Sequence, residues 1–276
     1  MISTESIEHY KGPALMSFRG SVYILPHPAL REYISCYMIT SPTTAGMHSN
    51  QTILPTASTT LVYSAHPRSI TSGLRGVNTK PVEIGSYAHN IPLMLLIEFH
   101  PAGLFLFTDI EQNLLADYSC AFDDLNPILN NQISRLFEQT ADISSLVSKL
   151  NQVLLASLGD HAMPDAMSAA MKLILSSGGI LSSRQLAAEI FYSEKQLNRI
   201  FRRYIGTGIK SFSRIVRTKR ALSFIEAGGK SLTCIAEQSG YYDVSHLIRD
   251  LKEVCGITPQ QYLQKMSIFY SDPYKL

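Results

Sequence analysis

The sequence contains no tryptophan and only four cysteines among its 276 residues. Disulfide frameworks and structural zinc sites need closely spaced thiols or Cys/His pairs. The cysteines lie far apart, at Cys36, Cys120, Cys234 and Cys255, and form no CxxC pair. We therefore expect four reduced side chains that pack as small hydrophobes, and neither a bound metal nor another cofactor.

Long apolar runs are also missing, since no stretch approaches the roughly 20 apolar residues of a membrane-spanning helix. The first residues lack the cationic segment, apolar run and small-residue cleavage site of a secretory signal. Hydrophobic residues nevertheless make up 45% of the chain, enough for a sizeable core. These features predict a cytoplasmic protein of two domains that does not bind a membrane.

Charge is divided unevenly along the chain. Residues 1–163 hold 8 Lys/Arg and 13 Asp/Glu, a net charge of −5, whereas residues 164–276 hold 16 and 9, a net charge of +7. A basic domain beside an acidic one is typical of a nucleic-acid binder that carries a second, separate module. We place the boundary in the segment from Gly159 to Pro164, which has turn-forming residues and no apolar periodicity.

The first part of the chain is predicted to be β-rich. Its strand candidates are rich in Val, Ile, Thr, Tyr and Phe and are separated by Pro and Gly, at the spacing of a compact β-sandwich or barrel. After Gly103 the apolar period becomes helical, which predicts two helices that close the domain, Asn126 to Gln139 and Asp142 to Leu158. The expected strands are Ser21 to Leu25, Tyr33 to Thr40, Thr59 to Ser64 and Leu93 to Phe99.

From Asp165 onward the sequence is helical almost throughout, and one unit occurs twice. Leu186-Ala187-Ala188-Glu189 precedes Gln196 to Phe201, and about 50 positions later Ile235-Ala236-Glu237 precedes His246 to Leu251. Each copy has a short helix with a small Ala facing inward, a turn, and a second helix with apolar residues at helical spacing. A helix-turn-helix unit needs the small residue because its two helices cross closely.

The second helix of each copy is predicted to read DNA. Its apolar residues fall on one side and leave polar and cationic side chains together on the other. The predicted DNA-binding residues are Lys195, Asn198, Arg199 and Arg202 in the first copy, and Ser245, His246, Ile248, Arg249 and Lys252 in the second.

A continuous helix is predicted between the two copies, from Gly208 to Glu226. At 1.5 Å per residue, this helix spans roughly 28 Å, close to the roughly 34 Å between successive major grooves on one face of DNA. Such a spacer can seat both recognition helices on one duplex. The predicted fold class is therefore α+β, with a β-rich domain at 1–163 and an all-α, DNA-binding domain at 164–276.

About Ile180 to Leu263, the chain resembles the AraC/XylS family of bacterial transcription regulators. The resemblance implies activation or repression of promoters, with double-stranded DNA and RNA polymerase as partners. It is weaker in the first domain, and there it implies a module that senses a small-molecule effector or forms a homodimer. The matching segments are Ala236 to Asp243, Ser245-His246, Arg249-Asp250, Gly256 to Tyr262 and Arg217 to Leu222, and, in the first domain, Ile53-Leu54-Pro55 and Ile97 to Gly103.

Two features depart from the family pattern. Phe191 stands where the family usually has the turn glycine of the first unit, and an L-residue at positive φ is strained, so we expect this turn to be reshaped. In the second unit Leu247 and Leu251 replace the more usual aromatics, and Val244 and Ile248 replace polar residues. Ile248 is then a candidate contact for thymine methyl groups.

Two alternatives to an effector-controlled regulator stay open. One is an effector-independent regulator whose first domain is a protein-interaction module. The other is an enzyme, in which Glu98 and His100 share a strand face and ligate a metal, although no closely spaced pair of histidines supports it. If an effector pocket exists, its polar and aromatic candidates are Tyr63, Arg75, Tyr87 and His89.

Overall fold

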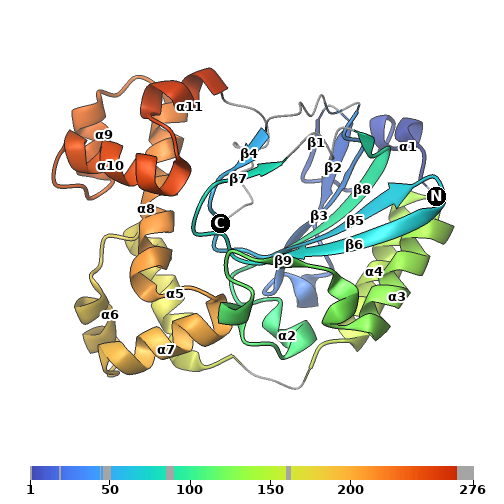
Figure 1. The fold of residues 1–276 in the computed structure, drawn as a ribbon, viewed down its shortest axis with the longest axis horizontal. Helices are drawn as coiled ribbons and strands as arrows, with labels where there is room; N and C mark the ends of the chain where they lie inside the picture. The colour runs from blue at the N-terminus through green and yellow to red at the C-terminus, as the bar shows by residue number, and fades with distance from the viewer. Residues whose placement is uncertain are drawn as a thin grey trace.

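The computed structural model describes residues 2–18, 20–43, 45, 51–84, 90–159 and 163–265. Its first domain is built on one antiparallel sheet of seven strands in the order β1-β2-β3-β8-β5-β6-β9 (Figure 1). A two-stranded sheet, β4 (Gln51–Ile53) with β7 (Val82–Ile84), lies between it and the helical domain. The strands of the large sheet are β1 Met16–Phe18, β2 Ser21–Ile24, β3 Ile34–Thr40, β5 Thr60–His66, β6 Ser69–Arg75, β8 Leu93–Phe99 and β9 Ser119–Cys120.

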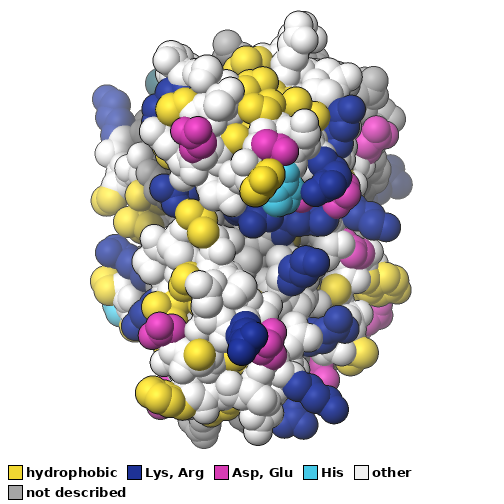
Figure 2. All heavy atoms as spheres, turned by 90° about the vertical axis from the view of Figure 1, so that its left-hand side faces the viewer, with side chains coloured by type: hydrophobic (Ala, Val, Ile, Leu, Met, Phe, Trp, Pro, Cys, Tyr) yellow, Lys and Arg dark blue, Asp and Glu magenta, His cyan; other side chains and the backbone are white. Residues whose placement is uncertain are grey.

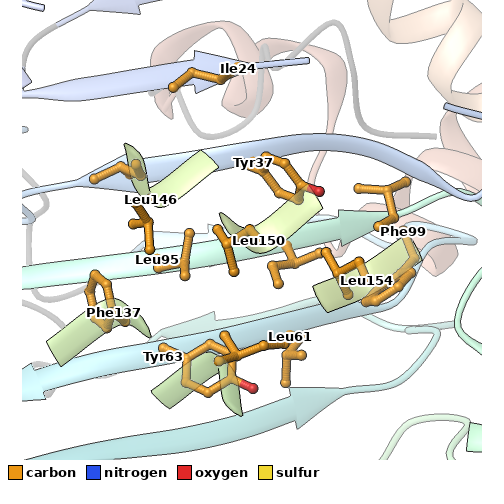
Figure 3. Packing of buried hydrophobic residues seen from close by; sticks show 14 of the residues in the cluster. Ile24, Tyr37, Leu61, Tyr63, Leu95, Phe99, Phe137, Leu146, Leu150 and Leu154 are labelled. Atoms are coloured by element: carbon orange, nitrogen blue, oxygen red, sulfur yellow. The ribbon is translucent and has the colours of Figure 1, made fainter. Parts of the chain in front are cut away.

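One face of the large sheet packs against two helices, α3 (Pro127–Gln139) and α4 (Ile143–Ala156). Figure 3 shows Leu146, Leu150 and Leu154 of α4 directed onto the strands, where they meet Tyr37 and Leu95. The leucines are fully buried because they recur at four-residue spacing on one side of the helix. Burying each such side chain contributes about 1.5–3 kcal/mol, so this layer is the main core of the first domain.

The opposite face of the sheet is also apolar but ends in a polar group. Tyr23, Cys36, Met38 and Leu96 form a separate buried cluster there. At one end of this face Glu98, Thr60 and Arg75 stand opposite one another on β8, β5 and β6. The Thr60 hydroxyl donates to a Glu98 carboxylate oxygen at 2.7 Å.

Short helices complete the first domain. They are α1 (Thr4–Glu8), α2 (Phe105–Thr108) and three turns of 3-10 helix, η1 (Pro28–Leu30), η3 (Gln112–Leu114) and η4 (Phe122–Asp124). The segment α2 to η3 lies at the edge of the domain that faces the helical domain (Figure 1). None of the described helices is long and apolar enough to cross a membrane.

The second domain is all helical, and its helices form two groups joined by one long helix (Figure 1). Buried residues of α5 to α7 and the start of α8 form one core, and those of the rest of α8 and α9 to α11 form another. The helices are α5 Asp165–Ser177, α6 Ser183–Glu189, α7 Glu194–Ile205, α8 Ile209–Ala227, α9 Leu232–Gln238, α10 Val244–Cys255 and α11 Pro259–Lys265.

The predicted fold class is confirmed: a β-rich domain with closing helices precedes an all-α domain with two helix-turn-helix units. Strand β8 has the predicted bounds. Helix α8 begins and ends one residue later than predicted and has the predicted length of 19 residues. The division at Pro164 stays our proposal, since Met163 packs against the cores on both sides of it.

Candidate nucleic-acid interface

The first helix-turn-helix unit consists of α6 and α7, and each helix begins at a capping serine. Ser182 accepts a hydrogen bond from the backbone N–H of Gln185, whose side-chain oxygen accepts one from the Ser182 backbone N–H. Ser193 and Gln196 form the same reciprocal pair at the start of α7. Such capping boxes satisfy N–H groups that the helix itself leaves free, and so they define where α7 begins.

The second unit consists of α9 and α10 and uses single caps. Ser231 accepts from the backbone N–H of Cys234, and Asp243 accepts from that of His246 at 2.7 Å. The turn between them has Gly240 at φ +75°, and a Cβ there would lie 2.5 Å from Cγ1 of Ile180. Glycine fits this turn without strain, and any side chain there would have to displace Ile180.

The first turn reaches the same left-handed conformation without a glycine. Phe191 has φ +59°, and its side chain is 95% exposed. The expectation that this turn is reshaped is therefore wrong. The backbone has the same left-handed conformation as at Gly240, and Phe191 adopts it with strain. An L-residue held there costs on the order of 1 kcal/mol or more.

Both units have the predicted inward faces. Ala187 and Ala236, the small residues of the first helices, are buried where the helices cross. Leu197 and Phe201 of α7 are buried in the first core, and Leu247 of α10 is buried in the second together with Leu251 and Val254. The helical period read from the sequence thus assigns the buried side of each recognition helix correctly.

Of the nine predicted DNA-binding residues, three are half-buried and six are exposed. Asn198, His246 and Ile248 are half-buried, and two of them have partners inside the domain. The Asn198 side-chain oxygen accepts from the backbone N–H of Ile209, the first residue of α8, and the His246 ring packs edge-on against Tyr241. The exposed members are Lys195, Arg199, Arg202, Ser245, Arg249 and Lys252.

The two recognition helices have the same orientation relative to the first domain. Residues at the C-terminal end of each, Gly206 after α7 and Gly256 after α10, lie against the first domain. Their N-terminal ends therefore lie on the opposite side, at the left of Figure 1. Figure 2 looks onto that side, where Lys and Arg side chains are spread over both units and along the seam between them.

Arg217, in the spacer helix α8, has an internal role. Its guanidinium donates to the Asp250 carboxylate at 2.8 Å and lies 4.7 Å from the centre of the Tyr241 ring. Both side chains of the ion pair are largely buried. Arg217 thus connects α8 with α10 and with the turn before α10. The ion pair is needed because a buried carboxylate is destabilising without a paired cation.

The four effector candidates do not form one group. Tyr63 points into the core under α3 and α4, whereas Arg75 pairs in register with Thr60 and therefore points to the opposite face of the sheet. Burial lowers the pKa of Arg75, and the Glu98 carboxylate opposes that shift. Tyr87 and His89 lie outside the described residues.

The metal alternative finds little support in the described part of the chain. Glu98 is buried and bonded to Thr60, and His100 follows the end of β8, where burial lowers its pKa. No group of three or more His, Cys, Asp or Glu side chains that could hold a metal occurs among the described residues. Cys36 and Cys255 are buried thiols, and Cys120 and Cys234 are half-buried.

One family match falls in the β-rich part of the chain and one in the helical part. Residues 186–265 match the helix-turn-helix domain family, and residues 23–121 match a domain family of unknown function. The helix-turn-helix match begins within α6 and ends with α11.

Solved structures of AraC-type proteins are similar to the chain. A regulator with an AraC-type DNA-binding domain from Chromobacterium violaceum has 23% identity and a TM-score of 0.34, over 39% of this chain and 94% of that one. The DNA-binding domain of AdpA, solved with a target DNA, has 20% identity and a TM-score of 0.34, over 36% and 90%. ToxT from Vibrio cholerae has 12% identity and a TM-score of 0.45, over 80% and 96%. Curated protein sequences gave no match.

Proposed function

We propose that the chain is a sequence-specific transcription regulator that reads one DNA duplex with α7 and α10 together. The observation that carries this proposal is the pairing of two capped recognition helices, each with an exposed cationic stripe and a free N-terminal end on the same side of the molecule. Recognition helices contact base edges with their N-terminal residues. Arginine there donates twice to guanine, which is the most common specific contact.

The test measures DNA binding by the full chain. Duplexes selected from a random pool are titrated by fluorescence anisotropy with wild type, Arg199→Ala, Arg249→Ala and, as a matched loss of one charge, Arg135→Ala on α3. Each recognition-helix variant is expected to bind the selected site about 5-fold to 150-fold more weakly, or by roughly 1–3 kcal/mol, with the loss concentrated at particular base pairs. Wild-type affinity should also fall steeply with salt. Equal binding by all four proteins would refute the proposal.

We further propose that a small molecule controls this regulator through the first domain. Support comes from the sheet face on which the buried apolar residues Met38 and Leu96 lie beside a polar group of Arg75 and Glu98. Such a combination suits an apolar ligand with one anionic or hydrogen-bonding group. A library of small apolar acids and amides should contain compounds that raise the melting temperature of wild type, because ligands of the folded state stabilise it.

Variants separate the two forms of regulation. Arg75→Gln should abolish the thermal shift, and Arg68→Gln in the exposed β5–β6 turn should retain it. If no compound shifts wild type, the effector-independent alternative is favoured, in which the first domain is a protein-interaction module. RNA polymerase is the partner that promoter regulation requires, and a homodimer through the first domain is the assembly to look for by light scattering.

A further inference from the structure

The core of the first helix-turn-helix unit is completed by residues of the other domain. Ala57, between β4 and β5, is 1% exposed, and Ala102, after β8, is 5% exposed. Both belong to the same buried cluster as Leu197 and Phe201 of α7. The connection that carries Ala57 is itself buried from Pro55 to Thr60, although connecting segments normally run over the surface.

The C-terminal end of α7 makes further contacts to the α2–η3 segment. The ring of Tyr204 packs on that of Phe105, with 4.6 Å between the ring centres. The backbone at Gly206, the C-cap of α7, lies so close to η3 that a Cβ there would be 2.8 Å from the carbonyl oxygen of Gln112. At the rim, Arg203 pairs with Glu111 at 3.4 Å.

The second unit touches the same domain at its own corresponding end. Leu54, just after β4, packs against the core of the second unit. A Cβ on Gly256, the C-cap of α10, would lie 3.2 Å from Cγ of Pro81, the residue before β7. The small β4–β7 sheet and the connection after it therefore lie against both units (Figure 1).

From these contacts we infer that the first domain is part of the DNA reader, because it sets the separation and rotation of the two recognition helices. The inference rests on the proposed function. The spacer helix α8 and the Ile180–Gly240 contact also join the units. The junction formed by Leu54, Ala57, Pro81, Phe105 and Glu111 holds both recognition helices from the end that does not face DNA. These five are positioning residues for the spacing of DNA elements.

The test uses the full chain and two junction variants. Ala57→Leu forces a larger side chain into a filled space, and overpacking of this kind displaces the surrounding structure. Glu111→Lys, at a half-exposed position, places a second cation beside Arg203 without disturbing a core. Adding Arg203→Glu restores a pair of opposite charges. Ile128→Ala, at a 74% exposed position on α3, is the control for loss of a surface side chain.

Each protein is titrated with DNA in which the two elements are moved by −2, −1, 0, +1, +2 and +5 base pairs. Wild type and Ile128→Ala should prefer one spacing. Ala57→Leu and Glu111→Lys should lower that preference by about fivefold or more, while their affinity for a duplex with a single element is unchanged. The double variant of Glu111 and Arg203 should recover the wild-type profile.

Amide hydrogen exchange without DNA provides a readout that does not depend on the proposed function. Residues 202–209 should exchange faster in both junction variants than in wild type, because overpacking at position 57 and repulsion between the cations at positions 111 and 203 each weaken the contacts that hold this segment closed. Faster exchange with an unchanged spacing profile would overturn the inference and leave the proposed function standing. Unchanged exchange in both variants would also overturn the inference. A wild-type protein without specific DNA binding would refute both the inference and the proposed function.

Discussion

Replacing Phe191 with glycine should stabilise the protein. The residue is held at φ +59° in the turn before α7, and its ring is 95% exposed, so the substitution removes strain and almost no packing. A left-handed L-residue costs roughly 1–2 kcal/mol, and a glycine adds about 0.4–1 kcal/mol of chain entropy to the unfolded state. The expected net gain is about 0.5–1 kcal/mol, or a melting temperature about 2 °C higher for a chain of this size.

Calorimetry on a small set of variants checks this reasoning. Phe191→Asn should also stabilise, because asparagine tolerates the left-handed region, whereas Phe191→Ala keeps a Cβ and should gain nothing. Gly240→Ala, the matching change in the second turn, should destabilise by more than 1 kcal/mol, since its Cβ is both strained and 2.5 Å from Ile180. A Phe191→Gly protein that melts below wild type would show that the ring stabilises the fold and that the strain argument is wrong.

Three other changes have defined outcomes. Arg217→Ala should lower the stability of the second unit by about 3 kcal/mol in denaturant melts, because it leaves the Asp250 carboxylate buried and unpaired. A fragment of residues 164–276 should fold and bind DNA with strong salt dependence, but melt below the intact chain because Ala57 and Ala102 are missing from its core. Burial lowers the pKa of His100, so the histidine takes up a proton at higher pH in the unfolded state than in the folded one. Wild-type stability should therefore fall as the pH drops below about 6.5. Melts at pH 5 and 7 should show that His100→Asn loses this part of the pH dependence.

Local signals account for what the sequence predicts well. The capping serines at 182 and 193, the turn before α10 and the uninterrupted apolar period of α8 all act within a few residues of the helix ends. Helix bounds follow from such signals because the free N–H groups at a helix start are satisfied by neighbours in sequence. The DNA-binding faces follow from the same period and stay predictions until they are tested.

Tyr63 and Arg75, two of the effector candidates, lie on opposite faces of the sheet, and the hairpin of β5 and β6 explains why. β5 and β6 are joined by the two-residue turn Pro67-Arg68, which pairs His66 with Ser69 and hence Thr60 with Arg75. Side chains alternate between faces along a strand, so Tyr63 and Arg75 must lie on opposite faces once this register is known. Recognising the turn in the sequence would have separated them.

Long-range contacts were not readable at all. Ala57 joins the core of α7 from about 140 positions earlier in the chain, and Arg217 reaches Asp250 across 33 positions. In the sequence Ala57 is one small residue in a Pro- and Ser-containing connection, and Arg217 is one cation among several on an amphipathic helix. Only the packing of complete helices and strands shows that Ala57 completes a core and that Arg217 forms an internal ion pair.

The connection that carries Leu54 and Ala57 also links the two proposals about the first domain. It continues directly into Thr60, whose hydroxyl donates to Glu98 at the polar end of the second sheet face. Only two residues, Ser58 and Thr59, therefore separate Thr60, at the group that an effector would touch, from the alanine packed under α7. Because protein interiors are close-packed, we expect a displacement of Thr60 to shift Ala57 as well. An effector bound at Arg75 and Glu98 would then act on the spacing of the recognition helices and not on the side chains of their outward faces.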